Sequence, residues 1–329
     1  MSSKTRYAER QIPQISLHDF EARIDSITSE LIDSAENVGF FTVINHGLTN
    51  EEIERMFSNS YSFFALSDEV KATVPWSSKN VGWEKNRQVR PSTGKPDTKE
   101  SYQLQFGENM TDVWIAEAHL PDFKTTSLEF MHKVQGISER LMRCFARGLS
   151  FPEDFFIKAH DVSRPNSQTV CRLLHYFALP EESDGKVYHR AGAHADWDFL
   201  TLLFQNAGQS GLEICPGREV VTEFGIGDIW TKVEPKTGEI VCNIGDLLMS
   251  WSDDRFKSTF HRVKAPCEPG DYYGDRYSIA YFNQPCTDST IQGPLKKYPM
   301  VTGQQFTENA MKRNFAALQE KLMAMDSMA

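Results

Sequence analysis

Residues 194–205 read HADWDFLTLLFQ, and this stretch determines how the rest of the chain is interpreted. Its apolar run is typical of a β-strand, on which successive side chains point to opposite faces. The alternation therefore predicts that His194 and Asp196 point the same way. A second histidine, His261, lies further along, after a segment GDLLMSWSDDRFKST that is interpreted as strand, turn and strand. Two imidazoles and one carboxylate on one side of a metal suit Fe(II) with open coordination positions.

The segment RYSIAYF (276–282) carries a second group of candidate residues. By the same alternation, Arg276, Ser278, Ala280 and Phe282 share one face of a strand. An arginine fork with a serine hydroxyl two residues on can hold a carboxylate through charge-assisted hydrogen bonds. The sequence therefore predicts a carboxylate site, with an aromatic side chain further along the same face.

The composition argues against several function classes. The chain has 329 residues, a net charge of −10 and a pI near 5.4, which disfavours nucleic acid or anionic membranes as partners. No apolar run approaches the ~20 residues of a membrane span, and the N-terminal MSSKTRYAERQ lacks the apolar region of a signal peptide. The six cysteines lack C-x-x-C spacing, so we expect reduced thiols and a cytoplasmic location. No G-x-G-x-x-G or phosphate loop is present, which disfavours a dinucleotide or ATP enzyme.

Residues 1–150 are predicted to be rich in α-helix. Apolar residues recur there at helical spacing in the segments 24–38, 53–64 and 127–148. Thr49, with Glu52 three residues later, has the pattern of a capping box and marks the start of the second helix. Residues 77–97 are polar and rich in Gly, Pro, Lys and Arg, which indicates a long loop or hairpin.

The pattern changes after about residue 168. Short apolar segments punctuated by Gly, Pro, Asn and Asp continue to about residue 290, which is typical of a sandwich or barrel. Residues 303–327 again have the spacing of an amphipathic helix. No repeat or low-complexity linker divides the chain, so we expect one domain over residues 1–329 with helices packed outside the β part.

The order of these motifs resembles a known family. H-x-D, a distal histidine after GDLL, and then R-x-S are similar to the Fe(II)/2-oxoglutarate-dependent dioxygenases of the isopenicillin N synthase-like group. The resemblance is strongest to the fungal branch that holds the pyrimidine-methyl hydroxylases, and ring-modifying oxygenases of fungal polyketide pathways also look similar. The segments that carry it are RLLHY, RAGAHADWDFLTLLFQ, GDLLMSWSDD, KSTFHRV and RYSIAYFNQP.

The resemblance implies a fold and a set of cofactors. The fold would be mainly β with flanking α, around a double-stranded β-helix (a cupin-like jelly roll). The cofactors would be Fe(II), 2-oxoglutarate as cosubstrate, and O2. The implied iron ligands are His194, Asp196 and His261. The implied 2-oxoglutarate contacts are Arg276, Ser278 and Tyr176.

The chain departs from the family pattern at three places. The connection from His261 to Arg276 is longer than usual, and a surface loop tolerates such length at little thermodynamic cost. Leu174 stands where the family often has Asn, which removes one polar contact. HADWD lacks the Thr that is common between the metal ligands and carries Trp197 and Asp198 after them. The first departure leaves the cosubstrate assignment in place, and the other two bear on the pocket.

Six residues are candidates for substrate contacts. Aromatic side chains suit a flat substrate through stacking, and arginines suit an anionic or enolic oxygen. The candidates are Phe282, Trp197, Arg190, Arg172, Asp198 and Asn206.

The function that this interpretation implies is oxidation of a C–H bond in a small molecule. We expect a small planar aromatic or polyketide-derived metabolite of fungal-type specialised metabolism, with hydroxylation as the outcome and ring expansion as a variant. A pyrimidine nucleobase methyl group is the alternative substrate. A non-catalytic jelly-roll binding protein and an oxidase that works without 2-oxoglutarate are the alternatives of another kind. No obligate protein partner is expected.

Overall fold

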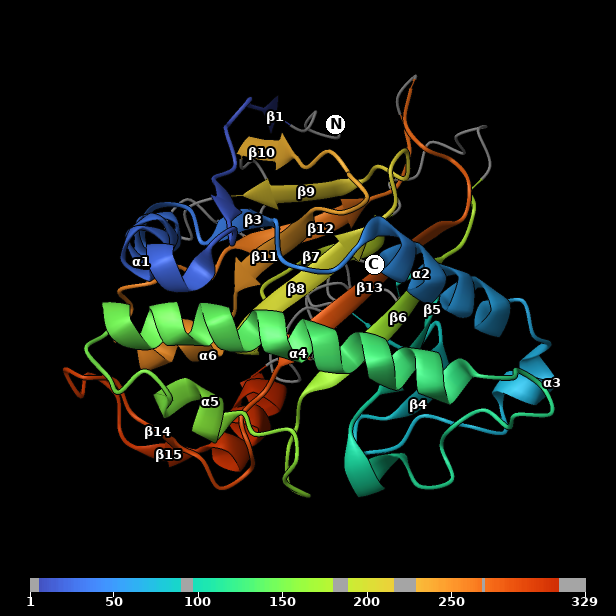
Figure 1. The fold of residues 1–329 in the computed structure, drawn as a ribbon. Helices are drawn as coiled ribbons and strands as arrows, with labels where there is room; N and C mark the ends of the chain where they lie inside the picture. The colour runs from blue at the N-terminus through green and yellow to red at the C-terminus, as the bar shows by residue number, and fades with distance from the viewer. Residues whose placement is uncertain (1–5, 90–96, 180–188, 216–228, 268–269, 314–329) are drawn as a thin grey trace, which may run out of the picture.

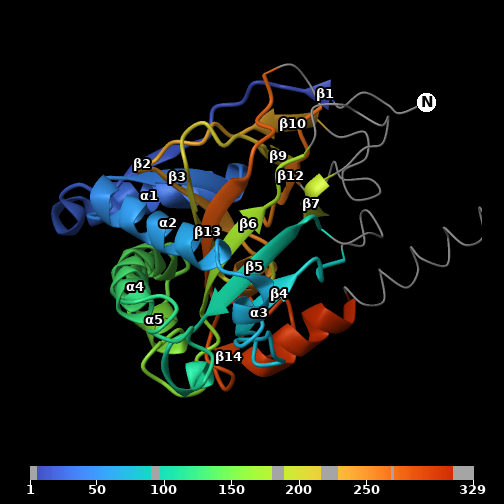
Figure 2. The same cartoon turned by 90° about the vertical axis from the view of Figure 1, so that its right-hand side faces the viewer.

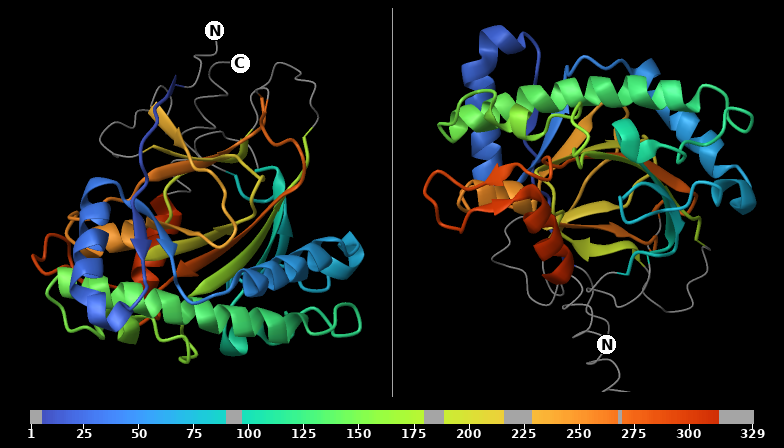
Figure 3. Two further views of the ribbon diagram at one scale, coloured as in Figure 1. Left: turned by 45° about the horizontal axis from the view of Figure 1, so that its top comes forward. Right: turned by 90° about the horizontal axis from the view of Figure 1, so that it is seen from below.

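Two β-sheets face each other, and helices cover the outer face of the larger sheet (Figures 1 and 3). The computed structural model describes residues 6–89, 97–179, 189–215, 229–267 and 270–313. Side chains from both sheets meet in an interior cluster that includes Leu174, Ala191 and Val263. The expected jelly roll with flanking helices is therefore confirmed.

The larger sheet has eight strands, and it takes strands from both halves of the chain. Their order is β2 (Gln14–Ser16), β3 (Phe40–Ile44), β11 (Ile240–Ile244), β8 (Leu200–Gln205), β13 (Arg276–Asn283), β6 (Val170–Tyr176), β5 (Lys99–Leu104) and β4 (Gly82–Lys85). The helix-rich first part of the chain thus contributes four strands to this sheet. One of them, β3, has the sequence FFTVI, whose aromatic and β-branched residues favour a strand. Within the polar segment 77–97, β4 pairs antiparallel with β5, and residues 90–96 lie outside the described residues.

The smaller sheet has five strands and supplies one wall of the interior. Its order is β1 (Arg6–Tyr7), β10 (Ile229–Lys232), β9 (Leu212–Cys215), β12 (Phe260–Lys264) and β7 (His189–His194). The register between β12 and β7 slips, because His261 pairs with His194 whereas Val263 pairs with Ala191. Between these two pairs β7 advances by three residues and β12 by two, so β7 carries one extra residue.

Three long helices pack on the larger sheet: α1 (Phe20–Asn37), α2 (Asn50–Phe64) and α4 (Phe123–Gly148). They gather on the side of the molecule away from β7, β9, β10 and β12 (Figure 2). The predicted capping box is present, since Thr49 accepts from the backbone of Glu52 and Glu52 from that of Thr49. From α4, Phe130 meets Phe204 with ring centroids 5.0 Å apart, which joins the helix to β8. No helix in the described part of the chain is long and apolar enough to cross a membrane.

The remaining helices are short and lie at the periphery of these layers. They are α3 (Asp68–Lys71), η1 (Gly107–Met110), α5 (Phe155–Ala159) and α6 (Asp246–Trp251). A two-stranded sheet of β14 (Thr290–Ile291) and β15 (Val301–Thr302) precedes a helix that starts at residue 303. This last helix is described as far as residue 313, so the rest of the predicted range 303–327 lies outside the described residues.

The prediction of strand, turn and strand for GDLLMSWSDDRFKST was wrong in its first part. Residues 246–251 form helix α6, whose buried residues are Leu247, Leu248 and Trp251. This spacing of one and four residues suits one face of a helix. A short apolar run of this length is also compatible with a buried strand, which is why the helix was missed. A Cβ at Gly245 would lie 2.0 Å from the carbonyl oxygen of Asp198, so only glycine fits where this helix begins.

The alternation predicted for residues 276–282 is present in β13. Ile279 and Tyr281 pack into the core beneath the helices, and Tyr281 Oη donates to Gln135 on α4 at 2.8 Å. Ala280 and Phe282 pack into the interior cluster instead. Arg276 shares the inner face with them, two steps before Ser278 and four before Ala280. The two ends of this strand therefore present a guanidinium and an aromatic ring to the same interior.

Candidate active site

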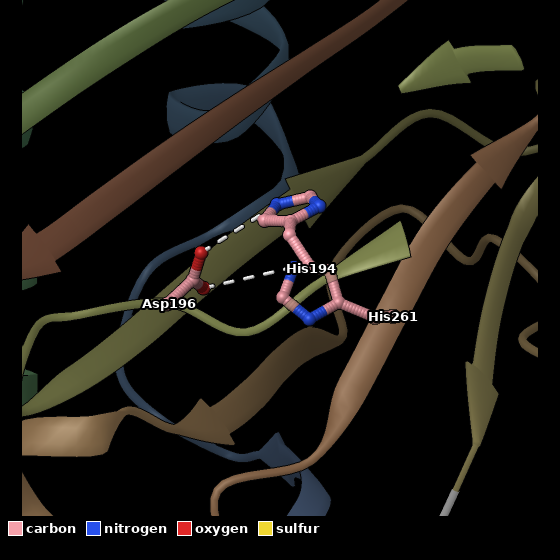
Figure 4. Close-up of side chains that lie close together, drawn as sticks. All are labelled: His194, Asp196 and His261. Atoms are coloured by element: carbon pink, nitrogen blue, oxygen red, sulfur yellow. Dashed lines mark ion pairs between the residues drawn. The ribbon is translucent and has the colours of Figure 1, made fainter. Parts of the chain in front are cut away.

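Three predicted metal ligands come together where β7 ends (Figure 4). His194 is the last residue of β7, and His261 is its cross-strand partner on β12. The Nε2 atoms of His194 and His261 each lie 3.7 Å from a carboxylate oxygen of Asp196. One ligand atom from each residue lies within 4.8 Å of the others, a spacing at which one metal ion can bind all three.

The route by which Asp196 reaches the site differs from the prediction. Strand alternation was expected to align it with His194, but β7 ends at His194 and Asp196 lies in the loop before β8. Two side chains hold the carboxylate there. Thr201 Oγ1 and Asn243 Nδ2 both donate to Asp196 Oδ2, at 2.7 and 2.9 Å. Burial opposes ionisation of Asp196, yet His261, His194 and these two donors hold its pKa below the usual range.

Backbone carbonyls orient both histidines. Nδ1 of His194 lies 2.7 Å from the carbonyl oxygen of Gly192, and Nδ1 of His261 lies 3.4 Å from that of Thr259. A hydrogen bond from Nδ1 leaves Nε2 as the lone-pair nitrogen, which is the atom that faces Asp196. Once both Nε2 atoms are deprotonated, the donor set is two imidazoles and one carboxylate, the combination that suits Fe(II) with open positions.

Asp198 does not lie with the other substrate candidates. It is 1% exposed and shares the hydroxyl of Thr201 with Asp196, at 2.9 Å. Burial, and then the charge of Asp196, raise its pKa well above the usual value. Its carbonyl oxygen accepts from Leu247 at the start of α6. Asp198 thus supports the loop that carries Asp196, through its contacts with Thr201 and Leu247.

The predicted carboxylate site lies at the start of β13. Arg276 is 1% exposed, and its Nη1 lies 3.5 Å from Ser278 Oγ. Its guanidinium carbon lies 5.2 Å from the centre of the Tyr176 ring, the cross-strand neighbour on β6. The structure therefore brings together all three residues that the resemblance implied for 2-oxoglutarate.

Gln205 is a member of this group that the sequence analysis missed. Its Oε1 accepts from Arg276 Nη2 at 2.8 Å, and it pairs with Ser278 across β8 and β13. Its register offered a signal, because Thr201 and Gln205 are an even number of residues apart on one strand. Thr201 was also missed, although the same alternation places it on the face of β8 that carries Gln205.

Phe282 and Arg172 form the aromatic end of the interior. The guanidinium carbon of Arg172 lies 5.1 Å from the centre of the Phe282 ring. Phe282 pairs with Thr201 across β13 and β8, so the ring neighbours the threonine whose hydroxyl donates to Asp196. The ring is only partly buried, and so is Trp197, which follows Asp196 in the metal loop.

Two candidates lie elsewhere. Asn206 Nδ2 bonds to the hydroxyl of Tyr61 on α2, so it belongs to the helix-facing side of the sheet. Its register explains this, because Gln205 before it faces the interior. Arg190 lies in β7 near Arg276 and donates to the carbonyl oxygens of Tyr273 and Gly274 at 3.3 and 2.5 Å. In these contacts the partners of both residues thus differ from Arg172, the partner of Phe282.

Comparison with known proteins identifies the family. The family model described as the 2OG-Fe(II) oxygenase superfamily matches residues 168–285, and that described as non-haem dioxygenase in morphine synthesis N-terminal matches residues 12–120. The 2-oxoglutarate-dependent dioxygenase htyE of Aspergillus rugulosus is 30% identical, over 80% of this chain and 83% of its own length. The chain belongs to the 2OG-Fe(II) oxygenase superfamily. A UPF0676 protein of Schizosaccharomyces pombe is 33% identical to this oxygenase, over 85% of this chain and 84% of its own.

A solved structure agrees with this membership. The thymine-7-hydroxylase of Neurospora crassa, in complex with alpha-KG and 5-formyluracil, is 29% identical to this oxygenase, with a TM-score of 0.76. The match covers 91% of this chain and 95% of that one. This oxygenase is thus an Fe(II)- and 2-oxoglutarate-dependent dioxygenase that uses O2, and its His-Asp-His cluster and buried arginine fit those requirements. The alternatives of a non-catalytic binding protein and of an oxidase without 2-oxoglutarate are set aside on this evidence.

Proposed function

We propose that this oxygenase hydroxylates a C–H bond of a small planar aromatic or polyketide-derived metabolite. The observation that carries the proposal is the Arg172–Phe282 pair, a guanidinium 5.1 Å from a partly exposed ring beside the metal site. A partly buried aromatic ring favours a flat ligand, because offset stacking adds about 0.5–1.5 kcal/mol to the burial of its surface. The neighbouring guanidinium favours a ligand that also carries a carbonyl or enolic oxygen.

The cosubstrate occupies the other end of the interior in this proposal. Arg276 and Ser278 bind the far carboxylate of 2-oxoglutarate, and Tyr176 lies against the same guanidinium. Arg276 and Phe282 are six residues apart on one strand, which corresponds to ~20 Å. In this proposal the cosubstrate and the substrate approach the metal from opposite ends of β13.

The residues of this chain bind and orient, and the cofactors supply the oxidation. His194, Asp196 and His261 hold Fe(II), which with 2-oxoglutarate and O2 oxidises the C–H bond and releases succinate and CO2. Thr201 and Asn243 keep the carboxylate of Asp196 ionised and aimed at the metal. Phe282 and Arg172 fix the ring of the substrate, so that one C–H bond lies near the metal.

A pyrimidine nucleobase is the second candidate substrate. The similarity to the thymine-7-hydroxylase in complex with 5-formyluracil favours it, since a pyrimidine is flat and carries carbonyl oxygens that Arg172 can bind. Trp197, next to Asp196, offers a further aromatic surface for either kind of ring.

The test is cosubstrate turnover with a panel of compounds. The Fe(II)-loaded protein is incubated with 2-oxoglutarate, O2 and, separately, thymine, hydroxylated aromatic ketides and L-proline. Succinate release and oxidised product are both measured. We expect stimulation by a flat compound with an oxygen beside the ring. Stimulation by L-proline alone would overturn the proposal while leaving the family assignment intact.

A further inference from the structure

Arg190 is a buried cation whose hydrogen-bonding capacity is only half used. It is 0% exposed, and its Nη2 donates to the backbone of Tyr273 and Gly274. Its Nε and Nη1 have no partner within the described part of the chain. An unpaired donor on a buried charged group is costly, because it has lost its hydration without replacement.

A second buried cation lies beside it. Arg276 is 1% exposed and follows Gly274, whose carbonyl oxygen accepts from Arg190 Nη2, by two residues. Burial first, and then the charge of Arg276, lower the pKa of Arg190 to about 10, while the charges of Tyr272, Tyr176 and Asp275 oppose this. Each guanidinium carbon faces a tyrosine ring, Arg276 that of Tyr176 at 5.2 Å and Arg190 that of Tyr272 at 5.8 Å. Two guanidinium groups in a dry interior repel each other strongly, and an anion between them removes that repulsion.

The surrounding side chains offer further donors to such an anion. Gln205 Nε2 is buried and has no partner among the described residues, although its Oε1 accepts from Arg276. Ser278 Oγ lies on the other side of the same guanidinium. Gln205 therefore has an unused donor beside the fork that the proposed cosubstrate site already uses.

We propose that Arg190 is a second arginine for the far carboxylate of 2-oxoglutarate, which it binds together with Arg276. The inference rests on the cosubstrate site proposed above, and it moves Arg190 from the substrate end to the cosubstrate end. Arg276 is bonded to Gln205 and Ser278, and Arg190 supplies Nε and Nη1 from the opposite sheet. The carboxylate is then clamped between the two walls of the jelly roll.

A purely structural role for Arg190 makes a different prediction. Its bonds to Tyr273 and Gly274 hold the segment that leads into β13, and loss of that support would disturb the whole interior. Such a disturbance would weaken every ketoacid alike. A role as a carboxylate ligand would weaken only those ketoacids that carry the far carboxylate.

The experiment compares two ketoacids on four variants. Anaerobic binding of 2-oxoglutarate and of 2-oxopentanoate, which has a methyl group in place of the far carboxylate, is measured by calorimetry on the Fe(II)-loaded protein. The variants are Arg190→Met, Arg190→Lys, Arg276→Met and Arg262→Met. The last is the matched control, because Arg262 lies in the same small sheet but stacks on Trp230 at 4.0 Å and pairs with Glu213 at 2.7 Å.

We expect Arg190→Met to weaken 2-oxoglutarate by ~10–100-fold, as loss of charged hydrogen bonds implies, and to leave 2-oxopentanoate within about twofold. Arg190→Lys should bind 2-oxoglutarate with an affinity between those of Arg190→Met and wild type, which keeps the test open if the methionine variant misfolds. Unchanged 2-oxoglutarate binding, or equal weakening of both ketoacids, overturns the inference. If Arg276→Met also binds 2-oxoglutarate normally, the proposed cosubstrate site itself is wrong.

Discussion

Phe282 and Thr201 are cross-strand neighbours on β13 and β8, and the hydroxyl of Thr201 donates to Asp196, the carboxylate of the candidate metal site. The aromatic ring therefore neighbours Thr201, the side chain that orients the carboxylate of Asp196. In the proposed function, a substrate stacked on Phe282 has its edge near the metal, and the position of the ring governs which C–H bond is presented.

Phe282→Ala should lower kcat/KM for the substrate about tenfold or more. Stacking contributes about 0.5–1.5 kcal/mol, and loss of buried area adds to it. A loosely held substrate also misses the oxidant, so the ratio of succinate to oxidised product should rise above that of wild type. Phe282→Leu is the control that keeps apolar volume without a ring. If both variants keep the wild-type ratio and kcat/KM, Phe282 is a packing residue.

Thr201→Val should weaken Fe(II) binding by ~10–100-fold, because groups that orient a metal ligand affect affinity by that amount. Asn243→Leu should act in the same direction, since both side chains donate to Asp196 Oδ2. Anaerobic titration with Fe(II) measures the change. Thr169→Val is a matched control, because Thr169 donates to the backbone of Gln284 at 3.0 Å. Equal affinities in all three variants would contradict the role given to Thr201.

Arg276→Met should raise the KM for 2-oxoglutarate and leave the KM for the substrate nearly unchanged. Truncating a buried, hydrogen-bonded charge pair costs on the order of 2–5 kcal/mol, part of which comes from the partner left unpaired. Steady-state kinetics with each reactant varied in turn separates the two effects. An unchanged KM for 2-oxoglutarate would show that other residues carry the far carboxylate.

His160 should make the fold sensitive to acid. It is 0% exposed, packs against Phe199 and Trp251, and burial lowers its pKa to about 4 although a bond to the Phe156 carbonyl opposes this. Below pH ~6.5 the unfolded chain binds a proton at this residue and the folded chain does not. The free energy of unfolding should thus fall by roughly 3 kcal/mol as the pH drops from ~6.5 to ~4.

His160→Phe removes that titrating group and keeps a ring in the core. Denaturant unfolding of both proteins at several pH values between ~4 and ~7 gives the two slopes. The variant should lose less stability on acidification than wild type. Parallel slopes would show that His160 does not contribute to acid sensitivity.

Much of the site was predictable because strands impose a period of two. The inner face of β13, with Arg276, Ser278 and Phe282, follows directly from that rule. The same rule applied to β8 would have revealed Gln205 and would have turned Asn206 away from the pocket.

Other features could not be read from periodicity. Asp196 and Asp198 lie in a loop, which has no repeating geometry, so their different directions depend on tertiary contacts with Thr201 and Asn243. Helix α6 was missed because a six-residue helix and a short buried strand have similar apolar patterns. The proximity of Arg190 to Arg276 depends on how two sheets stack, which no local pattern encodes.

The pairing of β3 with β11 has a consequence for biosynthesis. Phe40–Ile44 obtains this neighbour only when Ile240–Ile244 has left the ribosome, about 200 residues later. At ~5–20 residues per second, the nascent chain spends about 10–40 s with an apolar strand whose backbone is open on that edge. Such an edge invites pairing with other chains, so chaperone supply and translation speed should govern the yield of active enzyme during expression.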